Sequence, residues 1–218
     1  AWCYGTNAMF VGEYYLRTKD ESILPGFAQL LAQCEDSLLV DGVAGHHPNN
    51  PGYDGDAQIS GSGNLASAFA IAEHTPVKYK HGRATKMMED IQALAPLGMV
   101  PYGRALMRRV EKLTFDVNNG ASGQSSTAAT APYYIANKLI GGSDYYDKIV
   151  SKRFLNGPYG NVDGGHATHT IPFIMGSIAI NIASPQAHID NMGAFLWKLT
   201  THRGFDGLIV NNSNPMEH

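Results

Sequence analysis

Apolar residues recur along this chain at spacings of three and four, the period of an α-helix with one buried face. The first such pattern covers residues 4–18, where Met9 and Tyr14 belong to the apolar set. A second helical pattern runs to Cys34, and Asp20 stands where a helix N-cap is expected. The two patterns therefore predict a helical hairpin.

The hairpin pattern returns three times, at residues 61–76 with 82–94, 125–140 with 144–154, and 167–183 with 185–200. In each pair the first helix is rich in small and apolar residues around most of its circumference, while the second carries its charges on one face. This difference indicates an inner and an outer layer. We therefore predict an all-α fold in which residues 1–218 form one domain, an α/α-toroid-like arc of about four helical hairpins.

Three long polar segments separate the hairpins, at residues 41–60, 100–119 and 156–165. They are rich in glycine, asparagine, proline and histidine, which favour turns. Long connections of this kind inside a compact domain are usually functional or disordered. Since each leads from an outer helix to the next inner helix, we expect them to meet at one rim of the arc and form a polar cleft there.

Composition narrows the possible partners and location of the protein. The 218 residues carry 16 Lys+Arg against 19 Asp+Glu, a formal charge of -3, so nucleic acid and anionic membranes are not expected partners. The apolar runs fall short of the roughly 20 residues that a membrane span needs. The low charged fraction favours an extracytoplasmic protein. The chain starts without a recognisable signal peptide, so we expect a mature form or a fragment.

Two cysteines, Cys3 and Cys34, are too few for a disulfide framework or a thiolate metal site. Their place in the first hairpin permits a bridge between them. The favoured interpretation is that both are small buried hydrophobic residues.

Short motifs lie in order along nearly the whole chain: Trp2-x-Tyr4-x-x-Asn7, Glu13-Tyr14-Tyr15-Leu16, Gly45-His46, Val100-Pro101-Tyr102-Gly103, Asp116-x-Asn118-Asn119-Gly120, Gly165-His166 and Gly204-Phe205-Asp206-Gly207. Together they resemble an uncharacterised bacterial family of large, mostly exported proteins. The helical part of that family is similar to the terpenoid-cyclase and protein-prenyltransferase α/α-toroid. The resemblance implies a fold and no activity. A complete toroid of that kind has more hairpins than we predict here, so the arc is open or other segments or chains complete it.

The densest candidate site is Asp163, His166 and His169, at the expected start of the last inner helix. The two histidines are three residues apart and share a helix face. Three interpretations stay open. Asp163 caps the helix while the histidines bond loop carbonyls, or the histidines act as a general acid and base, or the three residues bind zinc with an open position for water.

The other candidates lie in the long segments and at the N-terminus. Asp116 joins His166 and His169 as a candidate catalytic residue, acting as a general base or orienting a histidine. The substrate-binding candidates supply hydrogen bonds or ring stacking; they are His46, Tyr53, Asn118, Asn119, Tyr102 and Trp2. For each of them a capping, turn-forming or core role is the simpler alternative.

The leading hypothesis is a binding or scaffolding module with a polar cleft for a polar small molecule or glycan. It needs no cofactor, with zinc as the alternative. A second hypothesis is a polysaccharide-type hydrolase or lyase using the same histidines and aspartate. A third, a cyclase or transferase on an apolar substrate, is disfavoured because the acidic motifs of such enzymes are missing from the sequence.

Overall fold

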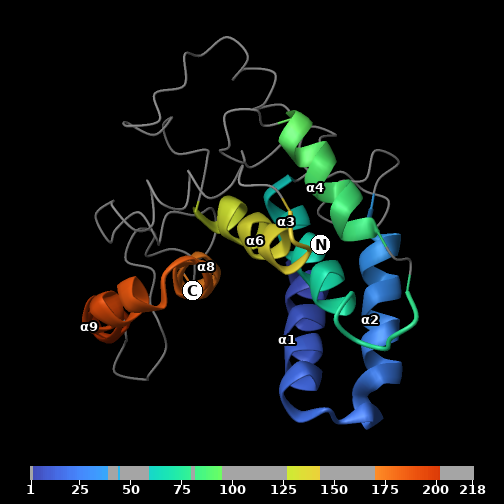
Figure 1. Cartoon of the computed structure of the whole chain (residues 1–218), viewed down its shortest axis with the longest axis horizontal. Helices are drawn as coiled ribbons and strands as arrows, with labels where there is room; N and C mark the ends of the chain where they lie inside the picture. Colours follow the sequence, from blue (N-terminus) through green and yellow to red (C-terminus); the bar gives the residue numbers. More distant parts are fainter. Residues whose placement is uncertain are drawn as a thin grey trace, which may run out of the picture.

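The computed structural model describes residues 2–38, 44, 59–79, 82–94, 127–142 and 170–201. Helices dominate this part of the chain (Figure 1): α1 (Trp2–Thr18), the short 3-10 helix η1 (Glu21–Ile23), α2 (Leu24–Asp36), α3 (Ile59–Ala72), α4 (Arg83–Leu94), α6 (Thr127–Leu139), α8 (Thr170–Ala183) and α9 (Pro185–Thr201). Within these ranges there is no strand, and extended pairing is limited to a bridge between Leu38 and Ala44. The predicted all-α class is confirmed.

Local sequence signals set the helix ends. The Asp20 side chain accepts a hydrogen bond from the Ser22 backbone N–H at 3.0 Å, and hydrogen bonds from Ser22 lower the pKa of the Asp20 carboxyl. Ser184 caps α9 by accepting from the Ala187 N–H at 3.2 Å. Gly141, with φ of +66°, follows the end of α6 in a conformation that glycine adopts without strain. Asp20 therefore caps a helix start as predicted, but the start is that of η1, and α2 follows at Leu24 with Ile23 at its N-cap position and no side-chain cap.

The first helices of successive hairpins run parallel to one another. Gly5 of α1 lies against Asn64 of α3, and Gly12 lies against Ile71. Both pairs have the same separation in sequence, which requires the two helices to run in the same direction. Two polar contacts show the same for α3 and α6. The Ser67 hydroxyl donates to the Pro132 carbonyl at 2.6 Å, and Nε2 of His74 lies 2.8 Å from the Leu139 carbonyl oxygen, with the same separation of 65 residues.

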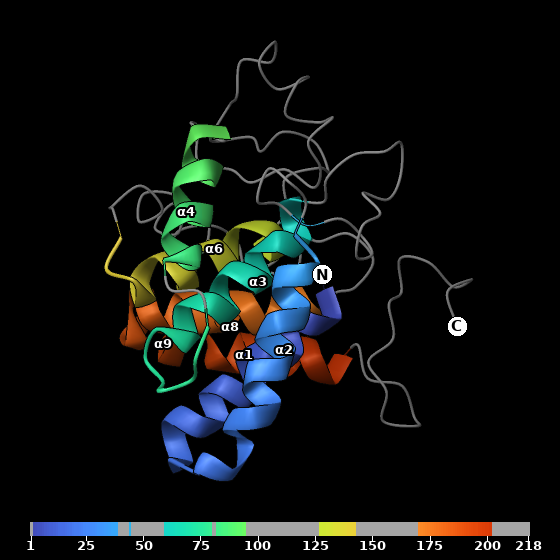
Figure 2. The same cartoon turned by 90° about the vertical axis from the view of Figure 1, so that its right-hand side faces the viewer.

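The row continues from α6 to α8, and the second helices lie beside it. α2 packs on α1 and also touches α3, α4 packs on α3 and also touches α6, and α9 packs on α8. Figure 2 shows α3, α6 and α8 side by side, with α1 and α2 next to α3. The predicted outer helix at residues 144–154 lies outside the described residues.

The core is centred on α3 because this helix has neighbours on both sides of the row. Every residue from 61 to 72 is buried, as is every residue from 131 to 137 in α6. Polar side chains share this burial in Ser62, Asn64, Ser67 and Asn137. The largest fully buried side chains are Tyr133, Tyr134, Phe27, Phe69, Leu31, Leu65, Met87 and Ile180. The small-residue character that the sequence shows for inner helices therefore corresponds to close packing in α3 and α6.

The two cysteines are free thiols in different surroundings. Cys34 is buried, as expected from the sequence, but Cys3 is exposed, so the prediction of a buried residue was wrong for Cys3. Cys3 lies near the start of α1, on the side of the helix that faces away from α3. Burial raises the pKa of the Cys34 thiol to about 12.

A thiol reagent should distinguish the two. Because thiolates and not thiols react, we expect a disulfide-exchange reagent to titrate one thiol per native chain near about pH 8 and two in urea. The Cys3→Ser variant should then show no fast thiol in the native state. Two fast thiols in the native wild-type chain would contradict the burial of Cys34, and none would contradict the exposure of Cys3.

Candidate functional site

The residues proposed from the sequence as catalytic, substrate-binding or metal-binding lie outside the described residues, with one exception. Those outside are His46, Tyr53, Tyr102, Asp116, Asn118, Asn119, Asp163, His166 and His169. Trp2 is the first residue of α1, but the placement of its side chain is not described. Their meeting in one cleft therefore stays a prediction. Among the described residues, no group of three or more His, Cys, Asp or Glu side chains is arranged to hold a metal ion.

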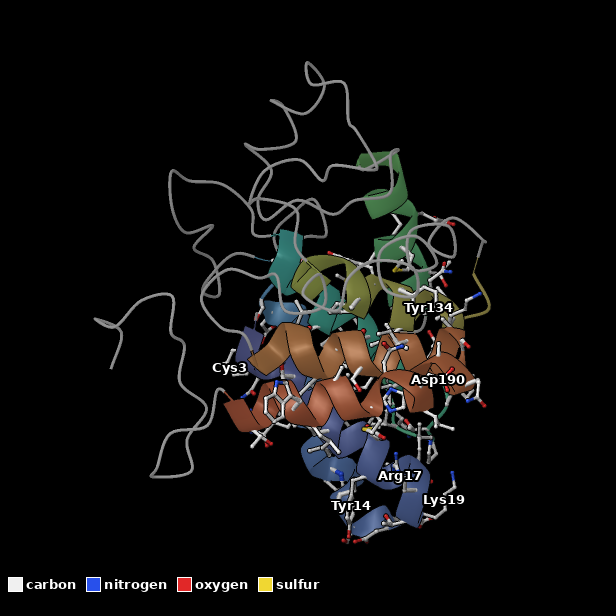
Figure 3. All side chains as sticks on the ribbon, turned by 90° about the vertical axis from the view of Figure 1, so that its left-hand side faces the viewer. Cys3, Tyr14, Arg17, Lys19, Tyr134 and Asp190 are labelled. Carbon is white, nitrogen blue, oxygen red and sulfur yellow. The ribbon has the colours of Figure 1, made fainter. Side chains whose placement is uncertain are left out.

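What the structure does place is the set of helix ends to which those segments connect. In Figures 2 and 3, α1, α3, α6 and α8 all begin on the same side of the molecule. Figure 3 shows Cys3, near the start of α1, on that side, where α8 also begins and α9 ends. The chain enters α3 at Ile59, α6 at Thr127 and α8 at Thr170. Along the chain, each of these helix starts comes after a polar segment that carries candidate residues, so the N-terminal end of the row is the candidate functional region.

Ser62 connects two elements at this end of the row. It lies in the first turn of α3, and its Oγ accepts a hydrogen bond from the Ala44 backbone N–H at 2.8 Å. Tyr133 of α6 also forms a side-chain hydrogen bond with Ser62, while its complete burial raises the pKa of the tyrosine hydroxyl. The neutral hydroxyls of Ser62 and Tyr133 together fix the position of the backbone at Ala44. Ala44 precedes His46, a substrate-binding candidate from the sequence, by two residues.

Asn64 occupies the crossing between α1 and α3. Its Nδ2 donates to the Thr6 hydroxyl at 3.1 Å, but its Oδ1 is buried and receives no hydrogen bond from the described residues. An unsatisfied buried acceptor costs roughly 1–3 kcal/mol. Asn64 therefore stabilises the crossing of α1 and α3 less than a side chain with all its polar atoms hydrogen-bonded would. Sequence reasoning passed over Ser62 and Asn64, although polar residues inside an otherwise small and apolar helix were a usable signal.

The buried polar side chains of this region are neutral. Ser62, Asn64 and Tyr133 are hydrogen-bonding groups that stay neutral, and Thr6 is only partly buried. Such groups hold helices in place and offer donors and acceptors; they do not supply a nucleophile with its own base. The acid–base candidates proposed from the sequence, Asp116, His166 and His169, all belong to the adjoining segments.

Comparison with protein families gives a match over the whole chain. The model of a family described as a domain of unknown function, DUF6288, covers residues 1–218. The chain belongs to this family. Comparisons with curated proteins and with solved structures gave no match. The predicted membership of an uncharacterised family is thereby confirmed. None of the described helices of this DUF6288 chain is long and apolar enough to cross a membrane.

Proposed function

We propose that this DUF6288 chain is a binding domain in which parallel helices form an α/α-toroid-like arc and present polar ligand-binding side chains at their common N-terminal end. The observation that carries the proposal is the parallel direction of α1, α3 and α6, given by the contacts of Gly5, Gly12, Ser67 and His74. Parallel inner helices oblige the chain to return to the same end before each new inner helix. In this proposal each polar segment therefore leads into its inner helix at the same end of the row.

The ligand we propose is a polar small molecule or a glycan. The candidate residues at that end are histidine, aspartate, asparagine, tyrosine and tryptophan, which combine hydrogen bonding with stacking on sugar rings. The first turn of each inner helix also leaves backbone N–H groups without intrahelical partners, and these favour ligand oxygens. We further propose an extracytoplasmic location, where such ligands are abundant.

Binding should depend on the N-terminal end of the row and not on its opposite end. We expect the purified chain to bind an oligosaccharide from a panel of neutral and acidic glycans in isothermal titration calorimetry. The His166→Ala variant should lower its affinity by about tenfold or more, the loss of one good hydrogen bond to a bound ligand. His74→Ala is the matched control, because His74 lies at the C-terminal end of α3 and is exposed. Its affinity should equal that of the wild type.

The outcome of the same experiment separates the proposal from its alternatives. Binding that is unaffected by His166→Ala, Asp116→Ala and Tyr53→Ala would contradict a site at this end. Release of reducing or unsaturated sugar ends, lost in His166→Ala and kept in His74→Ala, would instead establish a hydrolase or lyase. One zinc ion per chain that disappears in His169→Ala would support the metal interpretation. Tight binding of apolar polyprenyl compounds alone would favour the cyclase or transferase.

A further inference from the structure

Asn64 of α3 carries a buried acceptor to which no described residue donates. The residue has no exposed surface, and its Oδ1 atom receives no hydrogen bond from the part of the chain that the structure describes. Buried polar atoms of native proteins nearly always have a hydrogen-bond partner, so each exception needs an explanation. An apolar side chain of the same shape would avoid the cost of the unsatisfied oxygen. The acceptor is therefore best explained by a donor that a ligand supplies.

The Asn64 side chain points along α3 toward the N-terminal end of the row. In an α-helix every Cα–Cβ bond tilts toward the helix N-terminus, so this side chain lies over the preceding turn. Gly61, three residues earlier on the same face, has no side chain to block that direction. The Asn64 Nδ2 atom donates to the Thr6 hydroxyl of α1 at 3.1 Å, which restrains the amide. Oδ1 is therefore held on the side of the amide that faces away from Thr6.

The first turn of α3 places donors beside this acceptor. α3 begins at Ile59, and the backbone N–H groups in the first turn of a helix have no partner within it. Their partial positive charge favours an oxygen atom in front of them. α1 and α3 begin on the same side of the molecule (Figure 2), and Gly5 of α1 lies against Asn64. The acceptor and the helix donors therefore stand at the same end of two packed helices.

A hydroxyl is the ligand group that matches this arrangement. It donates its proton to Oδ1 while its oxygen accepts from an N–H group, so one group serves both partners. A carboxylate or sulfate oxygen suits the helix N–H groups but has no proton for Oδ1, and an ammonium group has protons but no acceptor. Because Asn64 is fully buried, the group that reaches it must be small. A single hydroxyl or hydroxymethyl arm meets this condition, and a whole sugar ring does not.

We propose that Asn64 and the first turn of α3 form a subsite for one hydroxyl group of a neutral sugar or polyol. This inference rests on the binding function proposed above and names a ligand group and a residue for it. Asn64 is the residue that contacts the ligand, through Oδ1. Thr6 is a positioning residue, because it holds the amide through Nδ2. The name hydroxyl subsite is used for Asn64 and the first turn of α3.

Asn64→Leu tests the hydroxyl subsite, because it keeps the size of the side chain and removes its polar atoms. The probes are maltotriose, cellotriose and mannotriose, titrated into the full chain in isothermal titration calorimetry. The sugar that binds the wild type most tightly should bind the variant about tenfold or more weakly, because its hydroxyl finds no acceptor. The urea midpoint of the variant should equal or exceed that of the wild type, since the unsatisfied oxygen is gone. A purely structural role would give a lower midpoint and unchanged affinity.

Asn137→Leu is the matched control. Asn137 is buried almost as fully, at 1% exposure, but it lies in the last turn of α6, at the opposite end of the row. This variant should keep wild-type affinity for the sugar. Circular dichroism must show that the variants are folded. If Asn64→Leu is not, Thr6→Val replaces it and should weaken binding several-fold, because the amide of Asn64 is no longer held in place.

Sulfate is the control ligand, because it accepts hydrogen bonds and cannot donate one to Oδ1. In a competition titration at constant ionic strength, sulfate should not displace the sugar. A sugar that sulfate displaces would show that the helix N-termini serve an anion, and the hydroxyl subsite would be wrong.

Two further results would overturn the proposal, and they differ in what they leave standing. Affinity that His166→Ala lowers and Asn64→Leu does not would keep the binding function and remove the hydroxyl subsite. A wild-type chain that binds none of the three sugars would contradict the proposed glycan binding together with the subsite.

Discussion

Replacing Phe69 with alanine is expected to lower the free energy of unfolding by about 3–5 kcal/mol. Phe69 is fully buried in α3, the helix with neighbours on both sides of the row. Its ring stacks on that of Tyr79 with centroids 6.1 Å apart, and the Tyr79 hydroxyl donates to the Phe69 carbonyl at 3.0 Å. Removing the ring leaves a cavity beside α3. This helix is held by its neighbours α1, α4 and α6, so the surrounding residues cannot easily move in to fill the cavity.

Urea denaturation followed by circular dichroism measures this loss, with Phe10→Ala as the matched control. Phe10 has the same side chain but 53% of its surface is exposed, so its replacement should cost less than about 1 kcal/mol. Since domains of this size are stable by roughly 5–15 kcal/mol, Phe69→Ala is expected to remove a large share of the total. Equal losses for the two variants would contradict the central position of α3.

The helices and their ends were predictable because the signals for them are local. The period of apolar residues, the capping side chains of Asp20 and Ser184 and the glycine after α6 act within one or two turns of the chain. α3 shows where such reasoning stops. The pattern predicts this helix from residue 61 and it begins at Ile59, but the sequence does not say which helices lie against Gly61-Ser62-Gly63-Asn64, which are buried between α1 and α6.

The reason is tertiary packing that a single sequence does not display. Gly63 lies against Pro132 and Tyr133 of α6, and Gly5 lies against Asn64, so small residues at these positions allow close approach of helices far apart in sequence. The same limit explains the error at Cys3. Burial was expected for Cys3 because free cysteines usually pack as small hydrophobic residues, whereas its exposure depends on which side of α1 has a neighbour.

The candidate site was predictable only in part. Inner and outer helices alternate in the sequence, and from this order we expected the long segments to lie at one end of the row. That expectation requires the inner helices to run in the same direction, which α1, α3 and α6 do. Whether His46, Asp116 and His166 approach one another depends on the paths of segments that have no periodic signal. Their convergence therefore stays a prediction for the binding experiment to test.

Adding one methyl group at Gly5 is expected to destabilise the protein by about 1–3 kcal/mol. A Cβ there would lie 2.8 Å from both the carbonyl carbon of Asn64 and the backbone nitrogen of Leu65. These are backbone atoms of α3 and no rotation of a side chain moves them, so α1 must shift away from α3. The shift would open the crossing where Asn64 donates to Thr6, at the end of the row that adjoins the candidate segments.

The sign of this effect distinguishes packing from helix propensity. Alanine favours an isolated helix over glycine by about 1 kcal/mol, so Gly5→Ala would stabilise the protein if nothing opposed it. Gly193→Ala tests that term alone, because a Cβ at Gly193 meets no atom within 4 Å, and it should stabilise α9 by about 0.5–1 kcal/mol. Urea denaturation at low concentration should therefore give changes of opposite sign for the two variants. If Gly5→Ala instead stabilised the chain as Gly193→Ala does, α1 and α3 would not cross at Gly5. The parallel direction of α1 and α3 would then rest on the contact between Gly12 and Ile71 alone, and the proposed binding end would lose part of its support.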